Sequence, residues 1–195
     1  MRGDYYNSYR NEINRALEAL VVTDASGQGM DAQPGFDLAC AWAETVRSLD
    51  GLIYFCGNGA SAAMASHMSL DWLKNSGVKA ACFNDLASLT AFGNDTGFEN
   101  VFALPLKRLA TSRDLLVTIS SSGNSPNVLA ALRQARESGM KSIAFSGLKS
   151  DNQSRGLADL SFYIPCRTYG IVECAHQMLL HSWLDQYMGV EEWKS

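Results

Sequence analysis

The chain has 195 residues, of which 47% are hydrophobic and 18% charged, as expected for one globular domain with a real core. Its net charge of −4 argues against a surface for nucleic acid or anionic lipid. The first residues lack the apolar core of a signal peptide, and no apolar run reaches the ~18 residues that span a bilayer. We therefore expect a cytoplasmic protein with no nucleic-acid or membrane partner.

Two helices are predicted at the start of the chain. Residues 4–24 carry apolar side chains at helical spacing, and a second helix is expected from Phe36 to Leu49, after a loop from Gly27 to Pro34. These leading helices, within residues 1–49, precede the strand–helix pattern. They need apolar partners, which another subunit could supply.

Strands and helices alternate from residue 50 to residue 190. Strands are expected near 52–56, 79–83, 114–119, 141–145 and 160–164, and helices near 61–74, 86–93, 98–110, 125–138 and 170–188. This order predicts an α/β fold with a doubly wound, five-stranded parallel sheet, in a single domain over residues 1–195. Cys56 and Cys82 fall within predicted strands, so we expect both to be buried thiols.

Two turns of small residues follow predicted strands directly. One is Gly57-Asn58-Gly59-Ala60-Ser61, and the other is the Ser-rich segment 120–125. Each joins a strand to the N-terminus of a helix, where free N–H groups and the helix dipole favour an anion. An ordinary connecting turn with a helix cap is the alternative. Two such turns at the carboxyl ends of strands in one domain favour a phosphorylated small molecule as ligand.

Histidines and carboxylates occur together on two predicted helices. His67 and Asp71 are four residues apart, so they share a helix face. This spacing suits a divalent metal, an acid/base pair or a plain intrahelical contact. Glu173, His176 and His181 lie on the last helix, where the alternative is surface polar residues on a half-buried helix.

Asn94 and Asp95 lie in a polar segment that we predict to be a turn between two helices. A turn with an Asp cap is one interpretation. A contact with a substrate hydroxyl is the other.

Taken together, these residues resemble the sugar isomerase (SIS) domain and, within it, the phosphoheptose isomerases. The matching segments are residues 56–63 with His67, 89–98, 119–129, and 173–176 with His181. The resemblance implies a flavodoxin-like SIS fold. It also implies a homotetramer with active sites shared between subunits, in which the leading helices pack.

The resemblance further implies an isomerase of heptose biosynthesis, a branch of carbohydrate metabolism. Its substrate would be a phosphorylated ketoheptose, sedoheptulose 7-phosphate, converted to D-glycero-D-manno-heptose 7-phosphate through an enediol. A zinc ion would be bound by His67, Asp71, Glu173 and His181, with Asp71 and His181 as the acid/base pair. The implied substrate-binding residues are Asn58, Gly59, Ser61, Asn94, Asp95, Ser120, Ser121, Ser122, Ser125 and Glu173.

The chain departs from the family pattern at four positions. Asp71 replaces a Glu, Glu173 replaces a Gln, and Gly170 and Ile171 replace an acidic residue and an Arg. The last two changes motivate an alternative, an isomerase of another sugar phosphate or of opposite C2 stereochemistry. A non-catalytic SIS adaptor that binds a replication initiator and a sugar-phosphate-sensing regulator are further alternatives. Because Asp71 and His181 are retained, an enzyme is favoured over an adaptor.

Overall fold

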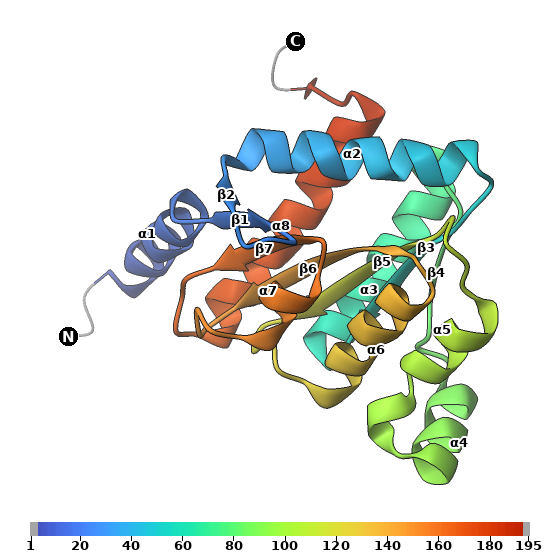
Figure 1. Cartoon of the computed structure of the whole chain (residues 1–195). Helices are drawn as coiled ribbons and strands as arrows, with labels where there is room; N and C mark the ends of the chain where they lie inside the picture. The colour runs from blue at the N-terminus through green and yellow to red at the C-terminus, as the bar shows by residue number, and fades with distance from the viewer. Residues whose placement is uncertain (1–3, 193–195) are drawn as a thin grey trace.

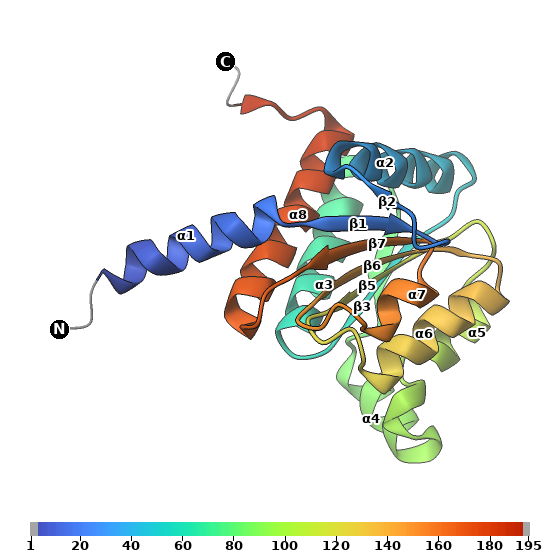
Figure 2. The ribbon, with the colours of Figure 1, turned by 60° about the vertical axis from the view of Figure 1, so that its left-hand side comes forward.

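The structure is a computed structural model that describes residues 4–192, and its centre is one twisted sheet (Figures 1 and 2). The strand order is β2-β1-β7-β6-β5-β3-β4. Five neighbouring strands, from β7 to β4, run parallel, which confirms the predicted doubly wound α/β sheet. The strands are β1 Val21–Asp24, β2 Gly29–Met30, β3 Ile53–Gly57, β4 Ala80–Cys82, β5 Leu115–Ser120, β6 Lys141–Gly147 and β7 Leu160–Ile164.

Helices cover both faces of this sheet. They are α1 Tyr5–Glu18, α2 Ala32–Ser48, α3 Ala60–Asp71, α4 Leu86–Thr96, α5 Ala103–Leu109, α6 Pro126–Glu137, α7 Gln153–Leu157 and α8 Tyr169–Met188. A π-helical turn, Trp72–Ser76, continues α3, and a short 3-10 helix, Phe98–Asn100, precedes α5. Within residues 4–192, no helix is both long enough and apolar enough to cross a membrane.

The prediction of a helix over residues 4–24 is wrong at its C-terminal end. The helix stops at Glu18, and Val21–Asp24 form β1, which pairs antiparallel with β7 and with the short β2. Two consecutive β-branched valines, Val21 and Val22, favour a strand here. The Asp24 carboxylate accepts from the backbone N–H groups of Ser26 and Gln28, so it closes the β1–β2 turn.

Alternate side chains of the central strands point to opposite faces of the sheet and pack in two separate hydrophobic cores. Ile53 and Phe55 pack under α2, α3 and α8, whereas Tyr54 and Cys56 pack toward α5 and α6. Cys56 is fully buried as predicted. The prediction for Cys82 is wrong, because this residue ends the edge strand β4 and is only half-buried.

The leading helices find partners within the chain itself. α1 buries Ala16 and packs against α8, although Figure 2 shows its N-terminal part extending from the body. α2 buries one side over the sheet and α8. Packing of either helix in an oligomer stays a prediction.

The sheet has a topological switch point between β3 and β5. The chain leaves β3 through α3 toward β4, and it leaves β5 through α6 in the opposite direction toward β6. Gly57, at the end of β3, pairs with Ile119 on β5. Both predicted turns therefore emerge side by side at the carboxyl ends of neighbouring strands, where ligands of open α/β sheets bind.

Candidate active site

The first turn, residues 57–61 (the Gly turn), is held tightly against the start of α3. A Cβ on Gly57 would lie 2.7 Å from the Ser61 backbone, so only glycine fits there. Gly59 has φ +57°, a left-handed conformation that glycine adopts without strain. Asn58 exchanges two amide hydrogen bonds with Asn127 of α6, at 2.9 and 2.8 Å. These bonds join the Gly turn to the helix that follows the second turn.

The second turn, residues 120–125 (the Ser turn), lines a polar cavity of about 140 Å³ beside the Gly turn. Ser121 is buried there, and its hydroxyl has no hydrogen-bond partner among the described residues. Ser120 Oγ and Ser125 Oγ lie 3.5 Å apart. The cavity is lined by Asn58, Ser61, Ile119, Ser120, Ser121, Ser122, Ser125, Tyr169 and Glu173, and thus by no Lys or Arg.

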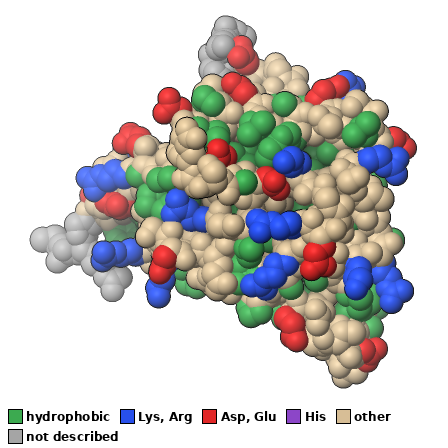
Figure 3. Space-filling model, in the orientation of Figure 1, with side chains coloured by type: hydrophobic (Ala, Val, Ile, Leu, Met, Phe, Trp, Pro, Cys, Tyr) green, Lys and Arg blue, Asp and Glu red, His purple; other side chains and the backbone are tan. Residues whose placement is uncertain are grey.

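A larger cavity, of about 490 Å³, lies between α1 and the β7–α8 connection. We assign the site to the smaller one, because hydroxyls and two helix N-termini converge there at the switch point. The face of the molecule in Figure 3 carries basic and acidic side chains interspersed. A phosphate in the cavity would be held by local hydrogen bonds.

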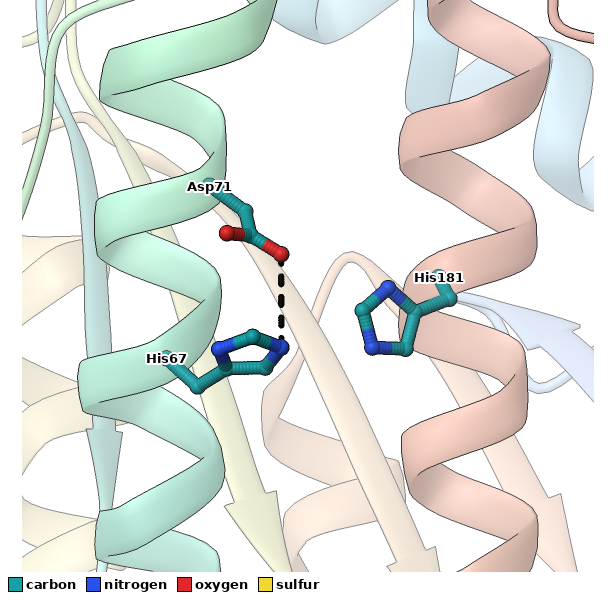
Figure 4. Close-up of side chains that lie close together, drawn as sticks. All are labelled: His67, Asp71 and His181. Carbon is teal, nitrogen blue, oxygen red and sulfur yellow. Dashed lines mark ion pairs between the residues drawn. The ribbon is translucent and has the colours of Figure 1, made fainter.

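A second group of polar side chains lies between α3 and α8 (Figure 4). His67 Nε2 is 3.3 Å from Asp71 Oδ2, and the His181 ring meets the His67 ring edge-on with centroids 5.2 Å apart. One ligand atom from each of these three residues, the His/Asp cluster, lies within 4.8 Å of the others. His181 is thus brought to the His67–Asp71 pair, although it lies more than a hundred residues further along the sequence.

Glu173, the fourth predicted metal ligand, lies outside the His/Asp cluster within the described chain and instead lines the Ser-turn cavity. It lies on α8, eight residues before His181, a rise of about 12 Å along the helix. Gln177, between them, donates to Met68 Sδ of α3 at 3.6 Å. The cavity and the cluster therefore lie along one line between α3 and α8.

Asn94 and Asp95 are not in a turn between helices, as we predicted, but in the last turn of α4. Both are exposed, Asn94 donates to Asp95 Oδ1 at 2.8 Å, and neither lines the cavity. α4 buries none of its residues and projects from the body in both ribbon views. A substrate contact by these two residues stays a prediction.

His176 is completely buried and lies beside the site rather than in it. Its Nε2 lies 3.0 Å from the Ser146 carbonyl of β6, so the neutral ring donates there. Burial lowers its pKa from 6.5 to about 4. Sequence analysis did not identify Asn127, which bonds Asn58, or Tyr169, which lines the cavity. The position of Asn127 directly after Pro126, at the start of α6, could have indicated it.

Comparison with known proteins identifies the family. A family model described as SIS domain matches residues 8–147. The chain therefore belongs to the SIS domain family, as its fold and paired turns indicate.

Phosphoheptose isomerases are among the relatives that match. The one from Solidesulfovibrio magneticus is 38% identical over 137 residues, which cover 67% of this chain and 66% of the relative. The one from Nitratidesulfovibrio vulgaris Hildenborough is 33% identical over 187 residues, covering 93% of this chain and 78% of the relative. The structure of the Neisseria gonorrhoeae phosphoheptose isomerase matches with a TM-score of 0.82 and 28% identity, over 96% of this chain and 99% of that one. These findings support an isomerase enzyme that acts on a sugar phosphate.

Proposed function

We propose that this protein converts sedoheptulose 7-phosphate to D-glycero-D-manno-heptose 7-phosphate through a cis-enediol. The observation that carries the proposal is the placement of the Ser-turn cavity and the His/Asp cluster along one line between α3 and α8. A sugar phosphate bound there would have its phosphate at the Ser turn. Its carbonyl end would lie toward groups that can move protons.

The Ser turn supports the phosphate-binding part of the proposal. The helices α3 and α6 both begin at the cavity, so their dipoles and N–H groups favour an anion. Ser121, with its unpartnered hydroxyl, supplies a donor that a phosphate oxygen would satisfy. Asn58, Gly59 and Ser61 would contribute from the Gly turn.

The His/Asp cluster fits a zinc ion. Two imidazole nitrogens and a carboxylate oxygen form a donor set that zinc prefers, and their atoms lie within 4.8 Å of one another. Bound there, zinc would polarise the sugar carbonyl as a Lewis acid. Glu173 is the proposed fourth ligand, although its side chain lines the Ser-turn cavity and would have to turn toward the His/Asp cluster to reach the ion. Its extra negative charge relative to Gln would then strengthen binding of a divalent cation.

Asp71 and His181 would exchange protons with the substrate. An aldose–ketose isomerisation needs a base that moves a proton between C1 and C2 and an acid that serves the oxygens. Asp71 already contacts His67, and His181 faces it from α8. A group that holds a metal tightly is a poor proton carrier, so Asp71 and His181 would each serve at a given moment either as a metal ligand or as an acid/base group.

A different sugar or the opposite C2 stereochemistry is the second candidate. Gly170 starts α8 beside Tyr9 of α1, and any Cβ on Gly170 would lie 2.6 Å from the Tyr9 hydroxyl. A phenol thus occupies space that a larger residue 170 would need. Ile171 is buried in the core rather than turned to solvent. These two departures from the family pattern, at Gly170 and Ile171, are the basis of the second candidate.

We also propose a homotetramer with shared active sites, working in the cytoplasm. The exposed apolar side chains on α1 and α4, together with the absence of buried residues on α4, support self-association. A partner subunit would then bring Asn94 and Asp95 to a neighbouring site.

The test is turnover of sedoheptulose 7-phosphate, with the product identified by NMR. We expect D-glycero-D-manno-heptose 7-phosphate from the metal-loaded protein, and loss of both bound metal and turnover after chelation. A product with the other C2 configuration would establish the second candidate. Unchanged turnover by metal-free protein would exclude the role of zinc, and no turnover of any ketose phosphate would contradict the enzyme assignment.

A further inference from the structure

Four consecutive carbonyl oxygens of the Ser turn, from Ser120 to Gly123, accept hydrogen bonds from the protein. The Ser120 carbonyl accepts from the Gly123 N–H at 3.0 Å, and the Ser121 carbonyl accepts from the Gly147 N–H at 3.0 Å. The Ser122 carbonyl accepts from the Asn124 side-chain amide at 3.2 Å. The Gly123 carbonyl accepts from Ser154. The donors to these four carbonyl oxygens all belong to residues that do not line the cavity.

The Gly123 carbonyl is the most strongly held of the four. It accepts from both the backbone N–H of Ser154, at 3.0 Å, and the Ser154 hydroxyl, at 2.9 Å. Ser154 is only 1% exposed and lies on α7, outside the cavity lining. The Gln153 N–H, at the start of α7, donates to Asn124 Oδ1 at 3.0 Å. α7 thus holds Gly123 and Asn124 of the Ser turn from outside the cavity.

The segment before α7 also presses directly on the turn. Gly123 has φ +61°, and a Cβ there would lie 2.1 Å from Asn152 Oδ1. Asn152 is itself held, because its amide donates to the Lys149 carbonyl at 2.8 Å. The Ser turn is therefore enclosed on this side by Asn152 and α7, with no room for a side chain between them.

This arrangement matters for an anion site that has no Lys or Arg in its lining. A free carbonyl oxygen turned toward a phosphate would repel it, and no formal positive charge is present to compensate. Hydrogen bonds that occupy the carbonyls leave the hydroxyls and N–H groups to face the ligand. Ser122 Oγ, for example, accepts from the Asn124 N–H at 3.3 Å, so its own proton is free to donate.

We propose that Ser154, assisted by the Gln153 N–H, is a positioning residue for phosphate recognition in this protein. It acts through the Gly123 carbonyl and keeps the acceptors of the Ser turn away from the cavity. The proposal rests on the proposed function, and it adds a determinant of phosphate affinity on an element that does not touch substrate.

Ser154→Ala is the first test variant, because it removes the hydroxyl donor and keeps the backbone donor. We expect KM for the ketose phosphate and the dissociation constant for inorganic phosphate both to rise about fivefold, the usual effect of one lost hydrogen bond. We expect kcat to change less than twofold, since the His/Asp cluster is untouched. Ser150→Ala, an exposed serine of the same connection, is the matched control and should change neither quantity.

Gln153→Pro is the second test variant, because it deletes the N–H that donates to Asn124 and otherwise replaces only an exposed side chain. Proline suits the first position of a helix, and the preceding Asn152, with ψ 142°, already has the extended conformation that a following proline requires. We expect the same direction of change as for Ser154→Ala. If Ser154→Ala does not fold, as judged by circular dichroism, Gln153→Pro decides.

Calorimetric titration with inorganic phosphate, in the absence of sugar substrate, tests this inference independently of the proposed reaction. Weaker phosphate binding in the variants supports the inference even if sedoheptulose 7-phosphate is not turned over. Unchanged phosphate affinity in folded variants, or a fall in kcat at constant KM, overturns it. Wild-type protein that binds no phosphate would overturn both the inference and the proposed function.

Discussion

Asp71 lies 3.3 Å from His67 Nε2 on its own helix, while His181 approaches from α8. The pairing of His67 with Asp71 follows from their spacing, because residues four apart share a helix face. The approach of His181 could not be read from spacing, since it depends on the packing of α3 against α8. Glu173 illustrates the same limit: the family resemblance assigned it to both the substrate site and the metal site, and its side chain lines the Ser-turn cavity but is outside the His/Asp cluster.

Asp71→Asn tests the charge of the His/Asp cluster. Removing the carboxylate charge weakens a divalent metal site and removes a proton acceptor, so we expect less bound zinc and about a 100-fold lower kcat. Asp71→Glu keeps the charge and serves as the matched control, with most of both properties retained. Metal analysis and steady-state kinetics provide the measurements. Equal zinc content and kcat in Asp71→Asn and wild type would contradict both roles of this residue.

His176 predicts an acid-dependent loss of stability. Its pKa is about 4 in the folded protein, compared with 6.5 for an ordinary histidine, so the unfolded chain binds the proton more readily. Its contribution is complete above about pH 6.5 and is lost as the pH falls toward 4, by up to about 3 kcal/mol.

Urea unfolding at several pH values between 7 and 4 measures this contribution. His176→Gln, which keeps an N–H donor for the Ser146 carbonyl and does not titrate, should be less pH-dependent over the same range. An identical pH dependence in wild type and His176→Gln would show that this residue is not the source.

At the scale of elements, the parallel strands and their helices were predictable, because buried apolar runs alternate with helical periodicity. β1 was missed because its apolar residues also continue the periodicity of α1, and only pairing with β7 makes it a strand. Asn94 and Asp95 were assigned to a turn on composition. The helix nevertheless continues through both residues. Near its end, the Thr96 hydroxyl donates to the Phe92 carbonyl and the Asn100 side-chain amide donates to the Thr96 carbonyl.

The close fit between β3 and α3 predicts that Gly57→Ala is harmful. Its Cβ would lie 2.7 Å from the Ser61 backbone, so the Gly turn must shift, at a cost of about 1–3 kcal/mol. We expect a lower melting temperature and weaker phosphate binding. Gly156→Ala in α7 meets no atom within 4 Å and is the control, expected to be neutral or slightly stabilising. Equal effects of the two substitutions would contradict the close fit.

At the scale of the whole molecule, one chain provides both the cavity and the His/Asp cluster, yet it leaves α4 without a buried residue. Leu86, at the start of α4, is 74% exposed, and Phe98 just after it is 58% exposed. Side chains of this kind gathered on a projecting helix are typical of a surface that packs against another protein. No sequence pattern distinguishes such a helix from one that is covered within its own chain.

These exposed side chains predict self-association, and under the proposed homotetramer we expect the purified protein to sediment as four protomers. Leu86→Glu should shift it toward smaller species and lower turnover, with little loss of stability in the isolated protomer, because an exposed side chain contributes little to the monomer fold. Glu137→Gln on α6 changes a charge elsewhere and serves as control. Monomeric wild-type protein at micromolar concentration would exclude α4 as an assembly surface and sharing of sites between subunits.

The Ser-turn cavity contains no lysine or arginine, and this has a practical consequence. Attraction between separated full charges fades as counterions accumulate, whereas short hydrogen bonds from hydroxyls and main-chain amides are scarcely affected. Substrate capture should therefore not weaken from dilute buffer to concentrated sodium chloride, because the charged group in the lining, Glu173, repels an anion and salt screens that repulsion. Tetrahedral oxyanions such as sulfate would still compete at the same salt strength, because they fit the shape and donors of the cavity.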